Sequence, residues 1–270
     1  MPRLVNLHPT RGGALVLGAL PFLVLIAAYL FGSAARLAEN PDDKLLPAPA
    51  AFVDTLQSYA VEEDRRSGEV LWWLDTGASL KRLLIALGIS AFIGIIAGLA
   101  IGAIPYVRSL LGPFVAAVAM IPPLAILPIL FIVLGLGEVA KIALIVFGVA
   151  PCIVRDVALR AGELPKEQLV KAQTLGASSW LLSTRVILPQ LWPRLIDALR
   201  LTLGSAWLFL IAAEAIASTE GLGYRIFLVR RYLAMDVILP YVIWITALAY
   251  GMDWLLRVAR ARLFPWAEMR

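Results

Sequence analysis

Long apolar runs separated by short polar segments dominate the pattern of this chain. A helix needs about 20 apolar residues, at a rise of about 1.5 Å each, to cross the hydrocarbon core of a bilayer. Six runs reach or approach this length, at residues 14–31, 83–104, 111–134, 139–154, 195–218 and 237–256. The pattern therefore predicts an all-α membrane protein with about six transmembrane helices.

The polar segments divide the chain into four parts. We expect an N-terminal tail and first transmembrane helix at 1–31, an acidic extracytoplasmic segment at 32–79, a membrane core at 80–260 and a tail at 261–270. Within the acidic segment, the pattern predicts a helix near 49–61 and a charged turn at 62–69. Trp72 and Trp73 follow, either as an anchor at the headgroup level or as part of an ordinary surface helix.

Charge indicates how the helices are oriented. Hydrophobic residues make up 61% of the 270 residues, and the net charge is +5. The number of Lys and Arg residues near the ends of the spans decides orientation. Placing the N-terminus inside puts most of the 24 basic residues inside and most acids outside. We therefore expect both termini in the cytoplasm, a lipid bilayer as the surroundings and no nucleic-acid partner.

The chemistry-bearing residues argue against an enzyme. One Cys and one His, Cys152 and His8, give no metal-ligand cluster, and Cys152 lies in an apolar run where packing is its expected role. The chain has no G-x-x-x-x-G-K-[ST] phosphate loop, so we expect no ATP hydrolysis by this chain.

An ion-coupled transporter or channel acting alone needs more intramembrane charges than Glu214 and Asp253.

The second run carries small residues at every fourth position. They are Ala86, Ser90, Gly94, Gly98 and Gly102. Small residues at this spacing share one helix face and let a second helix approach closely. The pattern predicts tight helix packing along this face, but it leaves the partner helix open.

Prolines interrupt the third run, at Pro113, Pro122, Pro123 and Pro128. A proline inside a helix removes a backbone hydrogen bond and kinks the helix. Membrane proteins tolerate such breaks where neighbouring helices or a cavity satisfy the backbone. Two readings stay open: a broken helix in which Pro122 and Pro123 line a pathway, and a bent structural helix.

Three acidic residues lie inside or at the edges of apolar runs. Glu214 lies about 21 Å along a helix from Arg200, and an ionisable group at such depth faces the protein interior or water. Glu214, with Trp207 on roughly the same face, is either a pathway or gating group or a buried acid bonded to a neighbouring helix. For Glu138 and for the Asp253–Arg257 pair, a salt bridge at the membrane edge is the simplest interpretation.

The polar interval 155–194 lies between two apolar runs. The pattern predicts a helix over 166–175 with Glu167 at its start and Gly176 as its C-cap. Ala177 continues the turn, and a second short helix over 180–188 stops at Pro189. The first helix is amphipathic, because Leu169, Ala172 and Leu175 share a side and Lys171 lies elsewhere. Such a helix suits a groove on another protein.

This interval resembles the cytoplasmic-loop signature of permease subunits from binding-protein-dependent ABC importers. The matching residues are Ala172, Gly176, Val186, Leu188 and Pro189, whereas Val170 and Lys171 depart from the Glu-Ala-Ala triplet of the signature. The segments 79–83, 121–128, 135–142, 212–216 and 221–224 resemble the nitrate, sulfonate and taurine branch of that family.

The resemblance implies a type I importer architecture in the bacterial cytoplasmic (inner) membrane. It implies a second permease copy forming a homodimer, two ATPase subunits on the 166–189 loop, and an extracytoplasmic solute-binding protein. ATP and Mg would bind the partner ATPase, with no cofactor in this chain. Transport would proceed by alternating access. The solute would be a small anion such as a sulfonate, taurine, nitrate or bicarbonate; the alternative is a heterocyclic or thiamine-precursor-like solute.

Overall fold

The computed structural model describes residues 9–41, 43–64 and 68–267, and these contain helices and no strands. His8 and part of the expected turn at 62–69 lie outside the described residues. The helices are α1 (Arg11–Glu39), α2 (Pro49–Ala60), α3 (Leu71–Ala103), α4 (Pro105–Val118), α5 (Pro123–Leu134), α6 (Glu138–Gly162), α7 (Lys166–Thr174), α8 (Ser179–Leu181), the π-helix η2 (Leu182–Ile187), α9 (Leu188–Ala217), α10 (Leu222–Val229), the 3-10 helix η3 (Arg230–Tyr232), α11 (Met235–Leu263) and the 3-10 helix η4 (Pro265–Ala267).

Among the described residues, five helical stretches are long and apolar enough to cross a bilayer, and a sixth is present if α4 and α5 form one span. Several spans are longer than their apolar runs. α3 begins at Leu71 instead of residue 83, and α6 continues to Gly162 instead of ending at 154. The apolar runs stop at charged residues such as Arg82, but the helices continue through them. Only residues 163–178 therefore separate the two long helical stretches on either side of α7, instead of the predicted interval 155–194.

The third apolar run is a broken helix. α4 and α5 meet at an angle of 93° across a short break that contains Pro122. Pro123 begins α5. Proline is tolerated there because a backbone N–H in the first turn has no acceptor within the helix. The two prolines therefore divide the run into two helices instead of bending one continuous helix.

Pro189 does not end a helix, contrary to the sequence prediction. α8, η2 and α9 form one continuous helical stretch, Ser179–Ala217. The backbone N–H of Leu188 bonds to Ser183 O, five residues back, which is the π-helical spacing. Because Pro189 directly follows this wider turn, the helix passes the proline ring and its missing donor without stopping.

α3, α6 and α9 supply most of the buried core, and α10 and α11 add to it. The small-residue ladder of α3 faces α6, which answers the question of the partner helix. A methyl group at Gly98 would lie 2.6 Å from Val157 Cβ, and one at Gly102 would lie 2.9 Å from Ala158 O. The backbones of α3 and α6 are therefore so close that this face has no room for larger side chains.

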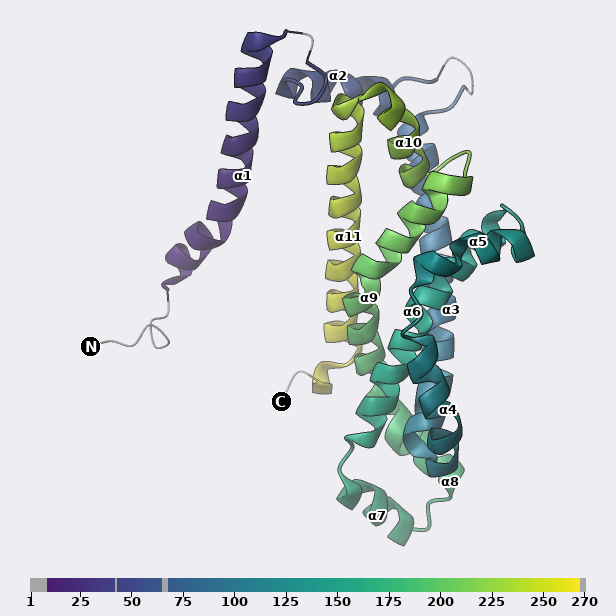
Figure 1. Cartoon of the computed structure of the whole chain (residues 1–270). Helices are drawn as coiled ribbons and strands as arrows, with labels where there is room; N and C mark the ends of the chain where they lie inside the picture. The colour runs from purple at the N-terminus through teal and green to yellow at the C-terminus, as the bar shows by residue number, and fades with distance from the viewer. Residues whose placement is uncertain (1–8, 42, 65–67, 268–270) are drawn as a thin grey trace.

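Figure 1 shows two ends of the molecule. α7 lies at one end, and α2 and α10 lie toward the other. We call these the α7 end and the α10 end. α1 stands apart from the bundle, and Tyr29 and Ser33 of α1 donate hydrogen bonds to Pro47 O at 2.6 and 3.1 Å.

The two tryptophans at the start of α3 differ in their surroundings. Trp72 is buried and packs against Tyr241 and Trp244 of α11, at centroid distances of 4.6 and 5.8 Å. Trp73 is 56% exposed, and its indole donates to Ala60 O at 3.1 Å. Trp72 therefore joins helices, whereas both readings from the sequence placed it at the surface.

Candidate functional site

The loop between α6 and α9 presents α7 at one end of the molecule (Figure 1). The helix predicted over 166–175 is present as Lys166–Thr174, with Glu167 in the first turn and Leu175 as the C-cap. Leu169 packs partly against the core, and Ala172 is half-buried. Leu175 is 82% exposed, so it does not share their buried side, contrary to the prediction.

The end of α7 is a Schellman motif. Gly176 has φ +85°, its N–H bonds to Gln173 O at 2.9 Å, and the N–H of Ala177 bonds to Ala172 O at 3.0 Å. These two bonds satisfy carbonyls at the helix terminus, and the positive φ suits glycine because it has no Cβ. The predicted C-cap at Gly176 is confirmed, and it fixes where the chain leaves α7.

The other loop residues singled out from the sequence lie on three elements, α7, η2 and α9. Lys171 is exposed on α7, Val186 is half-buried in η2, and Leu188 and Pro189 begin α9. Gln190 connects the elements, because its side-chain nitrogen donates to Val186 O at 2.8 Å and to Gln168 Oε1 at 3.3 Å. α9 therefore holds α7 through the hydrogen bond between Gln190 and Gln168.

Exposed apolar side chains lie on α7, at its C-cap and on the next helix, α8. Val170 is 55% exposed and Trp180 is 77% exposed, and Leu181 and Leu175 are also exposed. We call these four residues, with the exposed Lys171, the α7 surface. A polar loop with exposed aliphatic and aromatic side chains has the composition of a surface that another protein covers.

A second concentration of functional groups lies toward the α10 end. It joins α3, α6, α9, α10 and α11 through ionic hydrogen bonds, and we call it the ionic cluster. Its members are Asp75, Ser79, Arg82, Glu138, Lys141, Glu214, Ser218, Glu220, Arg225 and Tyr241. Of these residues, the sequence analysis had singled out Glu214 and Glu138 alone.

Glu214 is fully buried at the centre of the ionic cluster. Its carboxylate accepts hydrogen bonds from Ser79 Oγ at 2.8 Å, Arg82 Nη1 at 2.7 Å and Gly223 N at 2.9 Å. Gly221 has φ +122°, and a Cβ there would lie 2.6 Å from the carboxyl carbon of Glu214. These are the contacts expected of a buried acid bonded to a neighbouring helix.

Arg82 joins Glu214 to the start of α6. Its guanidinium also donates to Glu138 Oε1 at 2.9 Å and to Glu220 O at 3.0 Å. Lys141 contacts the same Glu138 carboxylate at 2.7 Å, so the expected salt bridge of Glu138 is present. The N–H donors of Arg82 therefore find acceptors on α9, on α6 and on the segment between α9 and α10.

Asp75 forms the other half of the cluster. It accepts from Gly221 N at 2.8 Å, Arg225 Nε at 2.8 Å and Tyr241 Oη at 3.2 Å. Burial disfavours the charged guanidinium of Arg225, but the hydrogen bonds and negative charge of Asp75 outweigh it, so the pKa of Arg225 lies above its usual value. Asp75 thereby holds α10 and α11 against α3.

The four pathway candidates do not meet. Trp207 and Glu214 are buried in α9, and the Trp207 indole nitrogen has no acceptor among the described residues. Pro122 is exposed at the bend and Pro123 is half-buried. None of the four lines the 690 Å³ cavity between α4 and α6. Their role in solute passage stays a prediction.

The Asp253–Arg257 pair expected from the sequence is present at 2.7 Å. Asp253 also accepts from Arg200 of α9 at 2.7 Å. The pair therefore holds α11 against α9 besides bridging successive turns of one helix.

An all-helical bundle with several apolar spans, a broken helix and a projecting loop helix defines a multi-pass membrane permease. Comparison with known proteins makes this class specific. A model of the binding-protein-dependent transport system inner membrane component family matches residues 90–265, and the chain belongs to this family. Membership implies an ATPase and a solute-binding protein as partners.

Relatives with named solutes support this assignment. The taurine transport system permease protein TauC of Escherichia coli is 34% identical over 82% of this chain and 80% of its own. The putative aliphatic sulfonates transport permease protein SsuC of Bacillus subtilis is 26% identical over 82% and 78%. The bicarbonate transport system permease protein CmpB of Synechocystis is 28% identical over 78% and 74%.

The fold also has a solved counterpart. A chain of the MetNI methionine ABC transporter, in an inward-facing conformation, superposes with a TM-score of 0.58 and covers 72% of this chain and 96% of its own. Sequence identity is 23%, so this likeness concerns the fold alone. The architecture is that of a type I ABC importer permease.

Proposed function

We propose that this chain forms the solute pathway of an ATP-driven importer and couples to a separate ATPase through α7. The α7 surface carries the proposal, because Val170, Leu175 and Trp180 are exposed on a short capped helix and on the helix that follows it. An amphipathic helix of this kind fits a groove on a partner. In this proposal the α7 end faces the cytoplasm of a bacterium, and both termini lie there.

The proposed assembly contains two copies of this permease, two ATPase subunits that hold ATP and Mg, and an external solute-binding protein. The ATPases move α7, and the helices alternate between inward-open and outward-open arrangements. Coupling is reciprocal, so a loaded binding protein at the α10 end must also bias the ATPases.

We propose a small anion as the solute, such as a sulfonate, taurine, nitrate or bicarbonate. The relatives named for taurine, aliphatic sulfonates and bicarbonate support this class. Binding assays on the partner solute-binding protein, with taurine, ethanesulfonate and bicarbonate as probes, test it. Preferential binding of a neutral heterocycle would contradict the anion class.

Gly176→Val tests the docking role of α7. Gly176 has φ +85° with open space around its Cβ position, so valine strains the backbone without a clash. Such strain in a non-glycine residue amounts to about 1–3 kcal/mol. We expect the variant to insert normally into the membrane but to lose co-purification with the ATPase.

Gly68→Val is the matched control. Gly68 also has a positive φ, +67°, and open space, but it precedes α3, away from α7. It should retain the ATPase. A Gly176→Val permease that binds its ATPase and transports normally would show that α7 is not the docking element.

A further inference from the structure

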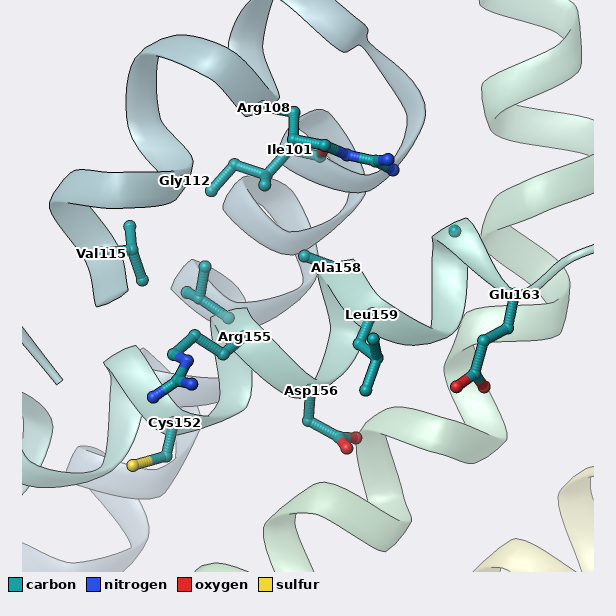
Figure 2. Close-up of a pocket in the computed structure, with 12 residues that line it drawn as sticks. Ile101, Arg108, Gly112, Val115, Cys152, Arg155, Asp156, Ala158, Leu159 and Glu163 are labelled. Atoms are coloured by element: carbon teal, nitrogen blue, oxygen red, sulfur yellow. The ribbon is translucent and has the colours of Figure 1, made fainter. Parts of the chain in front are cut away.

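A cavity lies between α4 and α6, toward the α7 end of the core. Its volume is about 690 Å³, within the range of small-molecule sites. Figure 2 shows the lining side chains, among them Ile101, Val115 and Leu159, with Arg108 and Arg155 reaching different parts of the cavity. Apolar walls with separate charged groups suit an organic ion.

Arg108 is already bonded within the chain. Its guanidinium donates to Ile101 O at 3.2 Å and to Gly102 O at 2.6 Å. These carbonyls belong to the last turn of α3, where backbone acceptors lack intrahelical partners. Arg108 therefore completes the end of α3 and contributes a fixed positive charge to the cavity.

The two acids of the cavity are also partnered. Asp156 lies 3.7 Å from Arg160, and Glu163 lies 3.0 Å from the same guanidinium. Both carboxylates therefore pair with Arg160, and the two guanidinium groups that line the cavity, those of Arg108 and Arg155, have no carboxylate partner in the described part of the chain.

Arg155 differs from Arg108 because it also lacks a backbone acceptor among the described residues. It is exposed, and within the described chain it makes no hydrogen bond or ion pair. It lies seven residues before the end of α6 at Gly162, in the part of the helix that follows the apolar run 139–154. A guanidinium without a partner in the chain keeps its N–H donors free for water or for an anion that enters the cavity.

We propose that the α4–α6 cavity binds a small oxyanion, such as a sulfonate, through Arg155. The planar guanidinium donates to two oxygens of one oxyanion, and such bonds are stronger than neutral ones. The apolar wall accommodates a short aliphatic tail. The inference deepens the proposed function and rests on its anionic solute, because it gives that anion a binding place within the permease.

Ethanesulfonate binding tests the site in the full permease purified with its ATPase in neutral detergent. Thermal unfolding is followed as sodium ethanesulfonate replaces sodium chloride at constant ionic strength. We expect a concentration-dependent rise in Tm. Arg155→Gln should weaken the apparent affinity roughly ten- to a hundredfold, the range of a charge-assisted hydrogen bond.

Arg262→Gln is the matched control, because Arg262 is exposed in the last turn of α11 and does not line the cavity. It should bind ethanesulfonate as the unchanged protein does. Equal affinity in the unchanged and Arg155→Gln proteins overturns the proposal, and so does an equal loss in both variants, since either shows that Arg155 makes no specific site.

The same chemistry fits the phosphate of a lipid headgroup. Nanodiscs of phosphatidylcholine, with and without phosphatidylglycerol, distinguish the two sources. An Arg155-dependent effect of phosphatidylglycerol without any effect of ethanesulfonate overturns the small-solute site. A Gly176→Val permease that keeps its ATPase would overturn the docking role of α7 but would leave Arg155-dependent binding of ethanesulfonate measurable, so the two proposals fail separately.

Discussion

Glu214 shows how one residue depends on partners that are distant in sequence. The sequence singled out this acid because of its depth, but it did not identify Ser79 or Arg82, which donate to its carboxylate at 2.8 and 2.7 Å. A signal was present, because Asp75, Ser79 and Arg82 are spaced four and three residues apart and so share one helix face. It was missed because the apolar run begins only after Arg82.

Glu214→Gln should destabilise the permease. Removing one partner of a buried ion pair leaves Arg82 with less compensation, and such losses amount to about 3 kcal/mol. Thermal unfolding in detergent should show a clearly lower Tm, with Glu220→Gln as control. Glu220 is 42% exposed and 3.3 Å from Arg82, so Glu220→Gln should lower the free energy of unfolding by less than about 1 kcal/mol.

Equal Tm values for the two variants would contradict the structural importance of Glu214. Unchanged stability of Glu214→Gln with lost transport would favour a gating role.

At the scale of elements, the spacing of small residues predicted a contact face, and the fold supplied the partner. Gly94, Gly98 and Gly102 all meet α6, whose bulky Ile153 and Val157 fill the space that the glycines leave. The loop helix and its glycine cap were predictable because both depend on local backbone geometry. Pro189 was misread because a π-helical turn, which the sequence does not announce, carries the helix past it.

Gly98→Ala should weaken the packing of α3 on α6. The added methyl group lies 2.6 Å from Val157 and 3.1 Å from Val154 O, and overpacking of this kind amounts to about 1–3 kcal/mol. Gly88→Ala, on the same helix with open space around the position, should not lower stability and should raise it by up to about 1 kcal/mol, because alanine favours the helix over glycine. Detergent unfolding of both variants makes the comparison. Equal stability of the two would show that α6 yields to the added methyl group.

At the scale of the whole molecule, a single chain leaves large apolar surfaces uncovered. α1 stands apart from the bundle (Figure 1), with Leu15, Phe22 and Phe31 of this helix at least 69% exposed. Lipid covers such surfaces in a bilayer, and the proposed second copy covers others. The family assignment depended on the order of motifs along the chain, whereas orientation and assembly depend on partners outside it.

The proposed assembly predicts a definite stoichiometry. Native mass spectrometry of the detergent-purified complex should give two permease chains with two ATPase subunits, because each copy presents one α7 surface. The Gly176→Val variant should give a permease pair without ATPase. A single permease chain bound to two ATPases would contradict the homodimer.

The sequence alone determined the helical class, the spans to within their polar ends, the capped loop helix and the resemblance to importer permeases. These follow from hydropathy, helix period and backbone preferences, which act over a few residues. The tertiary structure decided which helix meets the glycine ladder, which groups surround Glu214 and that Arg155 stands unpaired in a cavity. These depend on contacts between residues more than fifty positions apart or on the space between helices, and no local pattern specifies either.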